Sequence, residues 1–190
     1  KACQGPEKIA KCPESLAGMP VADGMILADA NWGNAVMTLL SIDPAVIEEA
    51  LMGHEAVAFV GAIGQPDAFA GELPCAYVEL VKGADVTPEA LMDFAKAHVH
   101  EKAAVPKHLE ILPELPKTAV GKVFKPDLRR RAITRVLNAA LAEAGLKADV
   151  AEVAEDKTRG LGARIRTTDT RDDAALATAM GAFTIAWDRV

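Results

Sequence analysis

The alternation of apolar and polar positions becomes regular after the first forty residues and predicts a helix followed by two strands. Asp43 before Pro44 is typical of a helix start, because proline fits the first helical position, so we expect a helix over 44–52. Apolar runs at 57–63 and 75–81 predict two strands. The residues between these runs are rich in glycine and proline, which predicts a long turn.

The next part of the chain predicts a helix, a short strand and a long helix. Thr87 before Pro88 marks a helix start by the same reasoning, and that helix should reach about Val99. Residues 108–112 (HLEIL) predict a third strand, which a proline closes. After a loop, apolar residues recur at helical spacing and predict a helix over 126–144 that ends before a glycine.

The last portion of the chain predicts a hairpin and a final helix. Residues 149–155 and 161–167 alternate between apolar and polar and flank a turn-forming segment. Thr170 or Asp172 should then cap a helix over 173–187. The element order describes an α+β fold, in which small sheets are covered by helices and a C-terminal hairpin and helix extend the domain.

The first forty residues show no such regularity. Glycine and proline interrupt residues 1–24 at short intervals, so neither a helical nor a strand period survives there. Residues 25–40 (MILADANWGNAVMTLL) are apolar enough to pack on another surface, although their pattern assigns no element. An apolar segment of this kind should be buried within the chain or between chains. We therefore expect a homodimer with Trp32 near the contact.

Composition and charge favour a soluble globular protein. Of the 190 residues, 51% are hydrophobic and 25% are charged, as in globular proteins. The formal net charge of −6 argues against nucleic acid as the main partner, because DNA affinity comes largely from neutralising phosphates. No apolar stretch approaches the roughly 20 residues that span a bilayer, so no membrane span is expected. The chain starts at Lys1 without a signal-peptide pattern.

The three cysteines favour a cytoplasmic location. Their number is odd and none forms a CxxC motif, which fits a reducing cytoplasm better than a secreted disulfide framework. Cys3 and Cys12 could pair, but two thiols nine positions apart carry little information. Cys75 lies in an apolar run, where we expect a buried and unreactive thiol.

The segment most informative about chemistry is 116–130, PKTAVGKVFKPDLRR. A glycine directly before Lys122 lets the backbone turn tightly and projects the lysine amine away from the body of the domain. Residues 117–135 contain seven basic side chains against one acidic, a local net charge of +6. In a chain of opposite net charge this asymmetry indicates an anion partner, such as a nucleotide or a CoA phosphate, although a solvated basic helix face has the same pattern.

This segment resembles the C-terminal signature of adenylate-forming enzymes, the superfamily of acyl-CoA synthetases, luciferases and peptide-synthetase adenylation domains. The family pattern is P-x-T-x-x-G-K-x-x-[KR]-x-x-L-R, and the chain matches it at every fixed position. The upstream sequence agrees in order and spacing, from IDPAVIEEAL through GQPDAFAGELP to VPKHLEILPELPKTAVGK. Because several motifs recur in the right order over residues 42–131, the resemblance is strong.

The resemblance implies a role for individual residues. Lys122 matches the adenylation lysine, whose amine bridges the acyl carboxylate and the α-phosphate of ATP. Gly121 belongs to the same motif, and Lys117, Lys125 and Arg129 are candidates for substrate or phosphate contact. In the family, this small domain then rotates and forms the CoA tunnel. The resemblance therefore implies ATP with Mg²⁺ and CoA as substrates of the complete enzyme.

The resemblance also shows what the chain does not contain. The phosphate loop, the Y-G-x-T-E segment and the T-G-D ribose-binding motif of the large N-terminal adenylation domain are absent, and GNAVMTLLSIDP replaces the charged hinge. We therefore divide the chain into an atypical N-terminal segment (1–40), an acyl-CoA synthetase C-terminal or lid domain (41–132), and an extension (133–190). We expect the partner to be the large domain, and the chain alone to be inactive as a ligase.

Three other interpretations are weaker. The first is a non-catalytic binding or assembly module derived from the lid domain. The second is a small hydrolase, but Ser15 and Ser41 are the only serines and neither lies in G-x-S-x-G. The third is a zinc site at HVHEK, where His98 and His100 would point to different faces of a helix and no fourth ligand is evident. We expect no metal site there.

Overall fold

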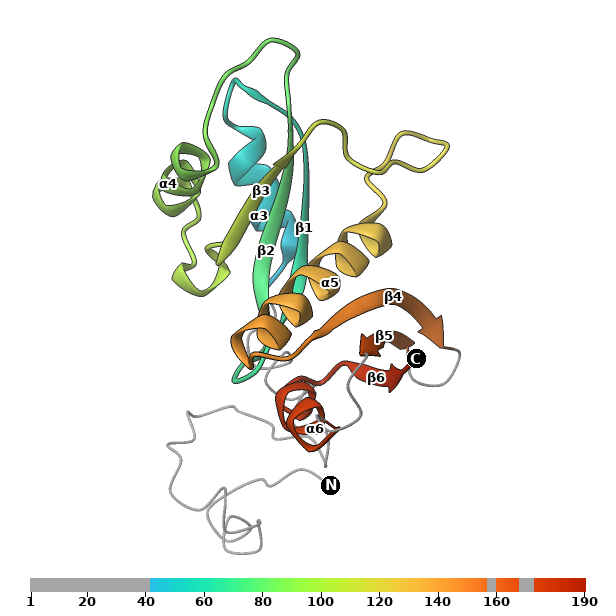
Figure 1. Ribbon diagram of the computed structural model, residues 1–190. Helices are drawn as coiled ribbons and strands as arrows, with labels where there is room; N and C mark the ends of the chain where they lie inside the picture. The colour runs from blue at the N-terminus through green and yellow to red at the C-terminus, as the bar shows by residue number, and fades with distance from the viewer. Residues whose placement is uncertain (1–41, 157–159, 168–172) are drawn as a thin grey trace, which may run out of the picture. The chain divides into compact units, whose positions relative to one another are not determined.

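A computed structural model describes residues 42–156, 160–167 and 173–190, which fold into four α-helices and two three-stranded sheets (Figure 1). The α+β class predicted from the sequence is confirmed. The Cys3–Cys12 pair and Trp32 lie outside the described residues, as does the apolar segment 25–40. No helix of the described residues is long and apolar enough to cross a membrane.

The first elements are the helix α3 (Pro44–Met52) and the strands β1 (Val57–Asp67) and β2 (Gly71–Leu80). The Asp43 carboxylate caps α3 by accepting the Ala45 N–H at 2.9 Å, as proline at the first helical position indicated. Strands β1 and β2 pair in an antiparallel hairpin.

The hairpin is longer than the sequence pattern predicted. Most of the segment expected to be a turn is strand, since Gly64 pairs with Pro74, and Asp67 pairs with Gly71. The Asp67 carboxylate accepts the N–H groups of Phe69 and Ala70, so the turn itself is only three residues long. The prediction of a long turn was wrong because glycine and proline describe local preference, whereas the partner strand supplies the hydrogen bonds.

The hairpin continues into a helix and a third strand. Helix α4 (Pro88–His98) begins at Thr87, whose hydroxyl accepts the Ala90 N–H at 3.2 Å. A short 3₁₀ helix, η2 (Lys102–Ala104), leads to β3 (His108–Leu112), which pairs in parallel with β2. The parallel pairing explains the helix between the two strands, because a parallel neighbour requires a crossover connection.

Helices cover both faces of the β1-β2-β3 sheet. Helices α3 and α4 pack on one face around Leu51, Val78 and Leu91. Helix α5 (Lys125–Glu143) contacts the other face through Leu128. Its approach to β1 is close, because a Cβ added to Gly61 would lie 2.4 Å from Leu128 Cδ1. Leu115 before this loop's hairpin and Leu128 after it belong to the same cluster of buried residues, so the loop before α5 is anchored at both ends to one core.

The second half of α5 packs on a second sheet, which consists of β4 (Ala148–Asp156), β5 (Gly160–Thr167) and β6 (Ala186–Arg189). Strands β4 and β5 form the predicted antiparallel hairpin. Helix α6 (Asp173–Gly181) lies between β5 and β6 in the sequence.

The final helix is shorter than predicted. It ends at Gly181 instead of continuing to Trp187, and its expected cap residues lie outside the described residues. The residues beyond it form β6, in which Ala186 and Trp187 pair in parallel with β5. The apolar pattern there is satisfied by burial in the second core, where Ile185 and Trp187 pack, and a short strand achieves this as well as a helix would.

Candidate functional site

The loop between β3 and α5 folds into a small hairpin that presents Lys122. Lys117 and Val123 form an antiparallel bridge at its base. The Thr118 N–H donates to the Lys122 carbonyl at 2.7 Å, and the Gly121 N–H donates to the Thr118 carbonyl at 2.9 Å. These bonds define a three-residue hairpin loop over 119–121.

Gly121 is the residue that allows this turn. Its φ of +80° lies in the left-handed region, which a side chain disfavours. A Cβ added at Gly121 would meet no atom within 4 Å, so the requirement for glycine is conformational and does not come from crowding. The tight turn expected from a glycine before Lys122 is therefore present.

The Lys122 side chain is exposed, and no described residue forms an ion pair or hydrogen bond with its ammonium group. Its backbone is fixed all the same, because its N–H donates to the Thr118 hydroxyl at 3.2 Å. Val120, at the tip of the same loop, is 80% exposed. The hairpin thus combines a defined backbone with a free cation.

Lys117, one of the predicted phosphate contacts, has a partner within the domain. Its ammonium lies 2.7 and 3.0 Å from the two carboxylate oxygens of Glu79 on β2. It also lies 4.2 Å from the centre of the Phe59 ring, close enough for a cation–π interaction. Glu79 accepts the Leu115 N–H at 2.8 Å as well, so one carboxylate binds both the loop backbone and Lys117.

The surroundings of Glu79 favour its ionised form. Burial alone would raise the pKa of this carboxyl group, but the Lys117 ammonium and the Leu115 N–H outweigh that effect and hold the pKa below its ordinary value. The pair is only partly exposed, at 22% for the Lys117 side chain and 15% for Glu79. A partly buried, hydrogen-bonded pair of this kind constrains geometry more than an exposed pair does.

Lys125 is also engaged. Its ammonium lies 2.8 Å from Glu48 Oε1 on α3, and the same oxygen accepts the Ala62 N–H of β1 at 2.8 Å. Arg129, by contrast, is exposed and has no ion-pair partner among the described residues. Among the phosphate contacts predicted from the sequence, Arg129 is therefore the one that, like Lys122, has no described counter-charge.

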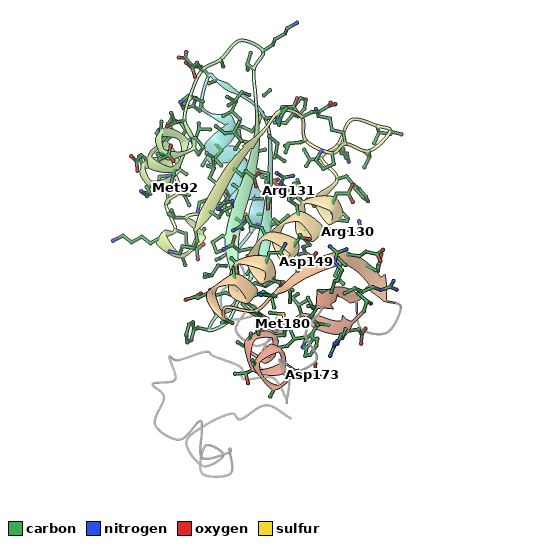
Figure 2. All side chains as sticks on the ribbon, in the orientation of Figure 1. Met92, Arg130, Arg131, Asp149, Asp173 and Met180 are labelled. Carbon is green, nitrogen blue, oxygen red and sulfur yellow. The ribbon has the colours of Figure 1, made fainter. Side chains whose placement is uncertain are left out.

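Arg130 and Arg131, which Figure 2 labels on α5, are both paired with carboxylates. Arg130 contacts Asp127 one turn earlier, and Arg131 forms two hydrogen bonds with Glu110 on β3. The Arg131 guanidinium is the main cause that holds the pKa of Glu110 below its ordinary value. The basic run that the sequence presents as a single anion-attracting patch is therefore divided. Four of its cations lie against carboxylates, Arg135 donates to the Gln65 amide oxygen, and Lys122 and Arg129 have no partner among the described residues.

A buried polar cluster lies between the first sheet and α5, and the sequence pattern did not single it out. The Tyr77 hydroxyl, His108 Nε2 and Arg135 Nε are buried without a hydrogen-bond partner among the described residues. Cys75 lies beside them, and burial raises the pKa of its thiol to about 11. The expectation that this thiol is buried is confirmed. A protonated, enclosed thiol is a poor nucleophile, so Cys75 is a structural part of the core.

His98, which was considered for zinc, has other contacts. The His98 ring stacks on Phe94, with 3.8 Å between ring centres, and its Nδ1 lies 2.8 Å from the Phe94 carbonyl. Within the described ranges, no three His, Cys, Asp or Glu side chains lie close enough together to hold a metal ion. His98 therefore helps to complete the end of α4.

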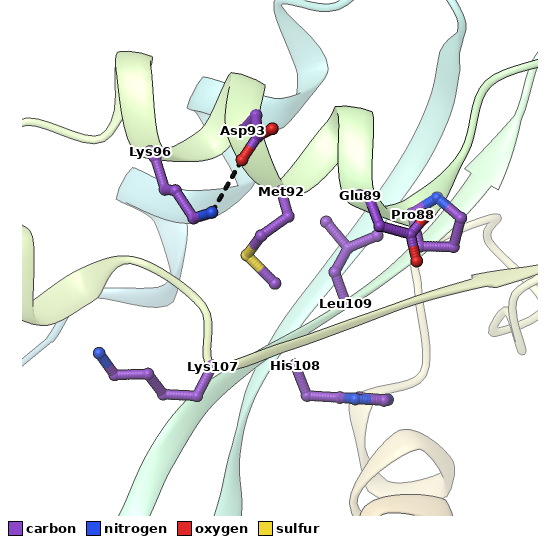
Figure 3. A pocket seen from close by; sticks show the side chains of 8 residues that line it. All are labelled: Pro88, Glu89, Met92, Asp93, Lys96, Lys107, His108 and Leu109. Atoms are coloured by element: carbon purple, nitrogen blue, oxygen red, sulfur yellow. Dashed lines mark hydrogen bonds and ion pairs between the residues drawn. The ribbon is translucent and has the colours of Figure 1, made fainter.

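A shallow depression of about 390 Å³ lies between α4 and β3 (Figure 3). The Met92 side chain points into it from α4, while Lys107 and His108 line it from the start of β3. Asp93 and Lys96 on its rim pair with each other at 2.8 Å. Its lining holds two acidic and two basic side chains, so their formal charges cancel, and none of its lining residues belongs to the Lys122 hairpin.

Comparison with known proteins identifies the first half of the described region. The model of the AMP-binding enzyme C-terminal domain matches residues 46–122. The chain is 44% identical over 95 residues to a marinolic acid–CoA ligase of Pseudoalteromonas sp. (strain SANK 73390), covering 50% of this chain and 14% of that protein. It is 44% identical over 93 residues to a long-chain-fatty-acid–CoA ligase of Bacillus subtilis (strain 168), covering 49% and 16%.

A solved acyl-CoA synthetase of Brucella canis aligns over 45% of this chain and 16% of its own, with 36% identity and a TM-score of 0.41. Residues 46–122 thus match the AMP-binding enzyme C-terminal domain, and the two relatives that align with about half of this chain are CoA ligases. It spans less than a fifth of the two CoA ligases just named. The family match ends at Lys122, and α5 runs without interruption through the expected domain boundary at 132.

Proposed function

We propose that this chain is the lid portion of an ATP-dependent acid:CoA ligase and that Lys122 is its adenylation lysine. The observation that carries the proposal is the free, exposed ammonium of Lys122 on a hairpin with a defined backbone, at the end of the family match. The two relatives named above are CoA ligases, which supports the same reaction class.

The chemistry requires a compact cation at this point. An acyl carboxylate and the α-phosphate of ATP repel each other, and negative charge increases as they react to form the acyl-adenylate. A lysine ammonium placed between them offsets that repulsion and stabilises the transition state more than the ground state. Lysine suits this position better than arginine, because its charge is concentrated at one point on a flexible stem.

The other binding functions fall to a partner. In this family the C-terminal domain normally pairs with an N-terminal adenylation domain. That domain would bind the adenine, the ribose and the acyl chain, while ATP with Mg²⁺ and CoA are the substrates of the pair. From this chain, Arg129 is the candidate for a phosphate contact beside Lys122, because its charge is not neutralised by a described residue. The chain alone should form no acyl-CoA.

The test joins the chain to a compatible adenylation domain and measures the two half-reactions separately. Lys122→Ala should lower pyrophosphate exchange by about 10²–10³, the scale for removing one charge-stabilising donor. Thioester formation from supplied acyl-adenylate should persist, because this lysine is proposed to act only in the first step. Lys122→Arg should restore little activity. Equal loss in both steps, or no loss in the first, would refute the role of Lys122.

The alternative of a non-catalytic binding or assembly module predicts a different result. In that case Lys122→Ala would leave pyrophosphate exchange unchanged in the joined protein. The homodimer expected from the apolar N-terminal segment is a separate prediction, which light scattering of the purified chain tests.

A further inference from the structure

We propose that Glu79 and Glu48 are positioning residues that hold the Lys122 hairpin from both sides. This inference rests on the proposed function, since it assigns Lys117 and Lys125 to positioning Lys122 and not to binding phosphate. It arises from the partners of these two lysines, which the sequence signature does not show.

The first attachment lies before the hairpin. Glu79 is on β2, in the middle strand of the first sheet, so its backbone is fixed by strands on both sides. Its carboxylate holds the Leu115 N–H and the Lys117 ammonium together. Because Lys117 is also the residue that bridges Val123 at the base of the hairpin, this contact fixes the hairpin directly.

The second attachment lies after the hairpin. Glu48 projects from α3 and accepts the Ala62 N–H of β1, which holds the carboxylate over the sheet. The same oxygen binds the ammonium of Lys125, the first residue of α5 and only three positions beyond Lys122. Glu48 and Lys125 are more exposed than Glu79 and Lys117, so solvent screens this second attachment more.

The two attachments together restrict how the hairpin can move. A hairpin held at its base by one contact can pivot about that contact, whereas contacts on both arms remove the pivot. The Phe124 N–H adds a bond to the Pro116 carbonyl at 2.7 Å, which closes the base between the two attachments. The Lys122 side chain then projects from a backbone whose position is fixed. Preorganisation of this kind lowers the free-energy cost of placing a charge beside the transition state.

The arrangement also argues against a phosphate role for the flanking lysines. Lys117 and Lys125 would each have to leave a carboxylate that already compensates their charge. Moving Lys117 would leave the Glu79 carboxylate, whose side chain is only 15% exposed, with no counter-charge and with the Leu115 N–H as its remaining partner among the described residues. A largely enclosed carboxylate without a counter-charge is unfavourable, so this exchange is disfavoured.

The first experiment measures hydrogen exchange in the 190-residue chain and needs no substrate. In Glu79→Gln, the amide protons of Thr118 and Phe124 should exchange about tenfold faster, because a hydrogen bond to a charged group has been lost. Glu48→Gln should produce a smaller increase at the same amides. Glu114→Gln is the matched control, since Glu114 is exposed in the same loop and has no partner among the described residues. It should leave exchange unchanged.

Amides of the sheet core, such as Ala76, report whether a variant has lost global stability, because they exchange only when the whole fold opens. If Ala76 and the hairpin accelerate equally in Glu79→Gln, the residue is a general stabiliser and the positioning proposal is wrong. Unchanged hairpin exchange in both glutamine variants would also overturn it. Lys117→Arg keeps the charge and should retain most of the protection, whereas Lys117→Met should not.

The second experiment measures pyrophosphate exchange in the protein joined to an adenylation domain. Glu79→Gln should lower kcat by about 10–10², the scale of a displacement of about 1 Å, with little change in the KM for ATP. A raised KM with unchanged kcat and unchanged hairpin exchange in Lys117→Met would instead identify Lys117 as a phosphate contact and overturn the proposal.

The two proposals fail in different ways. If Lys122→Ala leaves pyrophosphate exchange intact, the proposed function is wrong, whatever the hairpin does. If Lys122→Ala abolishes pyrophosphate exchange but Glu79→Gln changes neither hydrogen exchange nor kcat, only the positioning role is wrong.

Discussion

The two sheets of the described region repeat one order of elements with different chemistry. The first set runs α3-β1-β2-α4-β3 and the second runs α5-β4-β5-α6-β6. In each set the first two strands are antiparallel, and the third returns through a helix to pair in parallel with the second. Even the register irregularity recurs near the start of the first strand, between Val57 and Phe59 and between Val150 and Glu152.

The polar groups of the two sets differ. In the first set, Glu79 and Glu110 are partly buried, and each holds a basic residue of the segment that follows β3. In the second set, the pairs Arg164–Glu152 and Arg166–Asp149 lie on an exposed surface. The family match covers the first set only. A shared topology therefore does not imply a shared function, which depends on the side chains that the topology carries.

Helix α5 joins the two sets. Its first half buries Leu128 and Ala132 against the first sheet, and its second half buries Leu137 and Leu141 against the second. Helix α5, the first helix of the second set, thus completes the core of the first set. This sharing predicts that the described region unfolds as one cooperative unit.

The largest expected effect tests this cooperativity. Leu128→Ala and Leu137→Ala each remove a fully buried side chain from one of the two cores, so each should lower the free energy of unfolding by about 2–5 kcal/mol. If α5 couples the cores, both variants shift a single urea transition. Two transitions, of which only one moves in each variant, would show that the sets are independent.

A smaller effect tests the close contact between α5 and the first sheet. Gly61→Ala places a methyl group 2.4 Å from Leu128 Cδ1 and 2.9 Å from Val123 Cγ1, so it should destabilise the chain by about 1–3 kcal/mol. Gly162→Ala, in strand β5 of the second set, is the control. Its nearest neighbour is the Ala186 carbonyl at 3.4 Å, an ordinary contact. Urea denaturation measures both, and equal costs would contradict the packing described here.

The hairpin turn predicts a still smaller effect on stability. Gly121→Ala forces a methyl group onto a backbone with φ of +80°, which costs about 1–2 kcal/mol, mainly as local opening of the hairpin. Gly181→Ala is the matched control, because Gly181 ends α6 and its added Cβ would meet nothing within 4 Å. Hydrogen exchange at Thr118 should distinguish the two, and unaltered exchange in Gly121→Ala would argue against the turn.

The smallest effect compares the charged pairs through their pH dependence. Because the folded-state pKa of Glu79 lies below its ordinary value of 4.5, its pair stabilises the fold fully above that pH and loses this contribution as pH falls through the folded pKa. In Glu79→Gln, the free energy of unfolding should therefore decrease less as the pH is lowered.

The matched variant in the second set is Glu152→Gln, which removes an exposed pair and should cost less than about 1 kcal/mol at neutral pH. Urea midpoints measured between pH 3 and 7 test both variants. If Glu79→Gln leaves the loss of stability at acid pH unchanged, the pair of Glu79 with Lys117 contributes no stability.

The sequence by itself determined the elements whose signals are local. Asp43 and Thr87 each precede a proline and start a helix where expected, since capping involves residues only two or three positions apart. The same holds for Gly121, whose positive φ follows from a tight turn in the signature. The signature also located Lys122, because a short motif places its residues within one loop.

The tertiary structure decided the features that depend on distant partners. The β1–β2 hairpin extends through glycine and proline because each strand completes the hydrogen bonds of the other, and the last residues form β6 because β5 offers an edge. The partners of the flanking lysines were decided in the same way. Lys117 meets Glu79 across 38 positions of sequence, and only the fold brings these charges together. Charge along the chain shows that a segment is basic, whereas the fold determines which of its cations remain free.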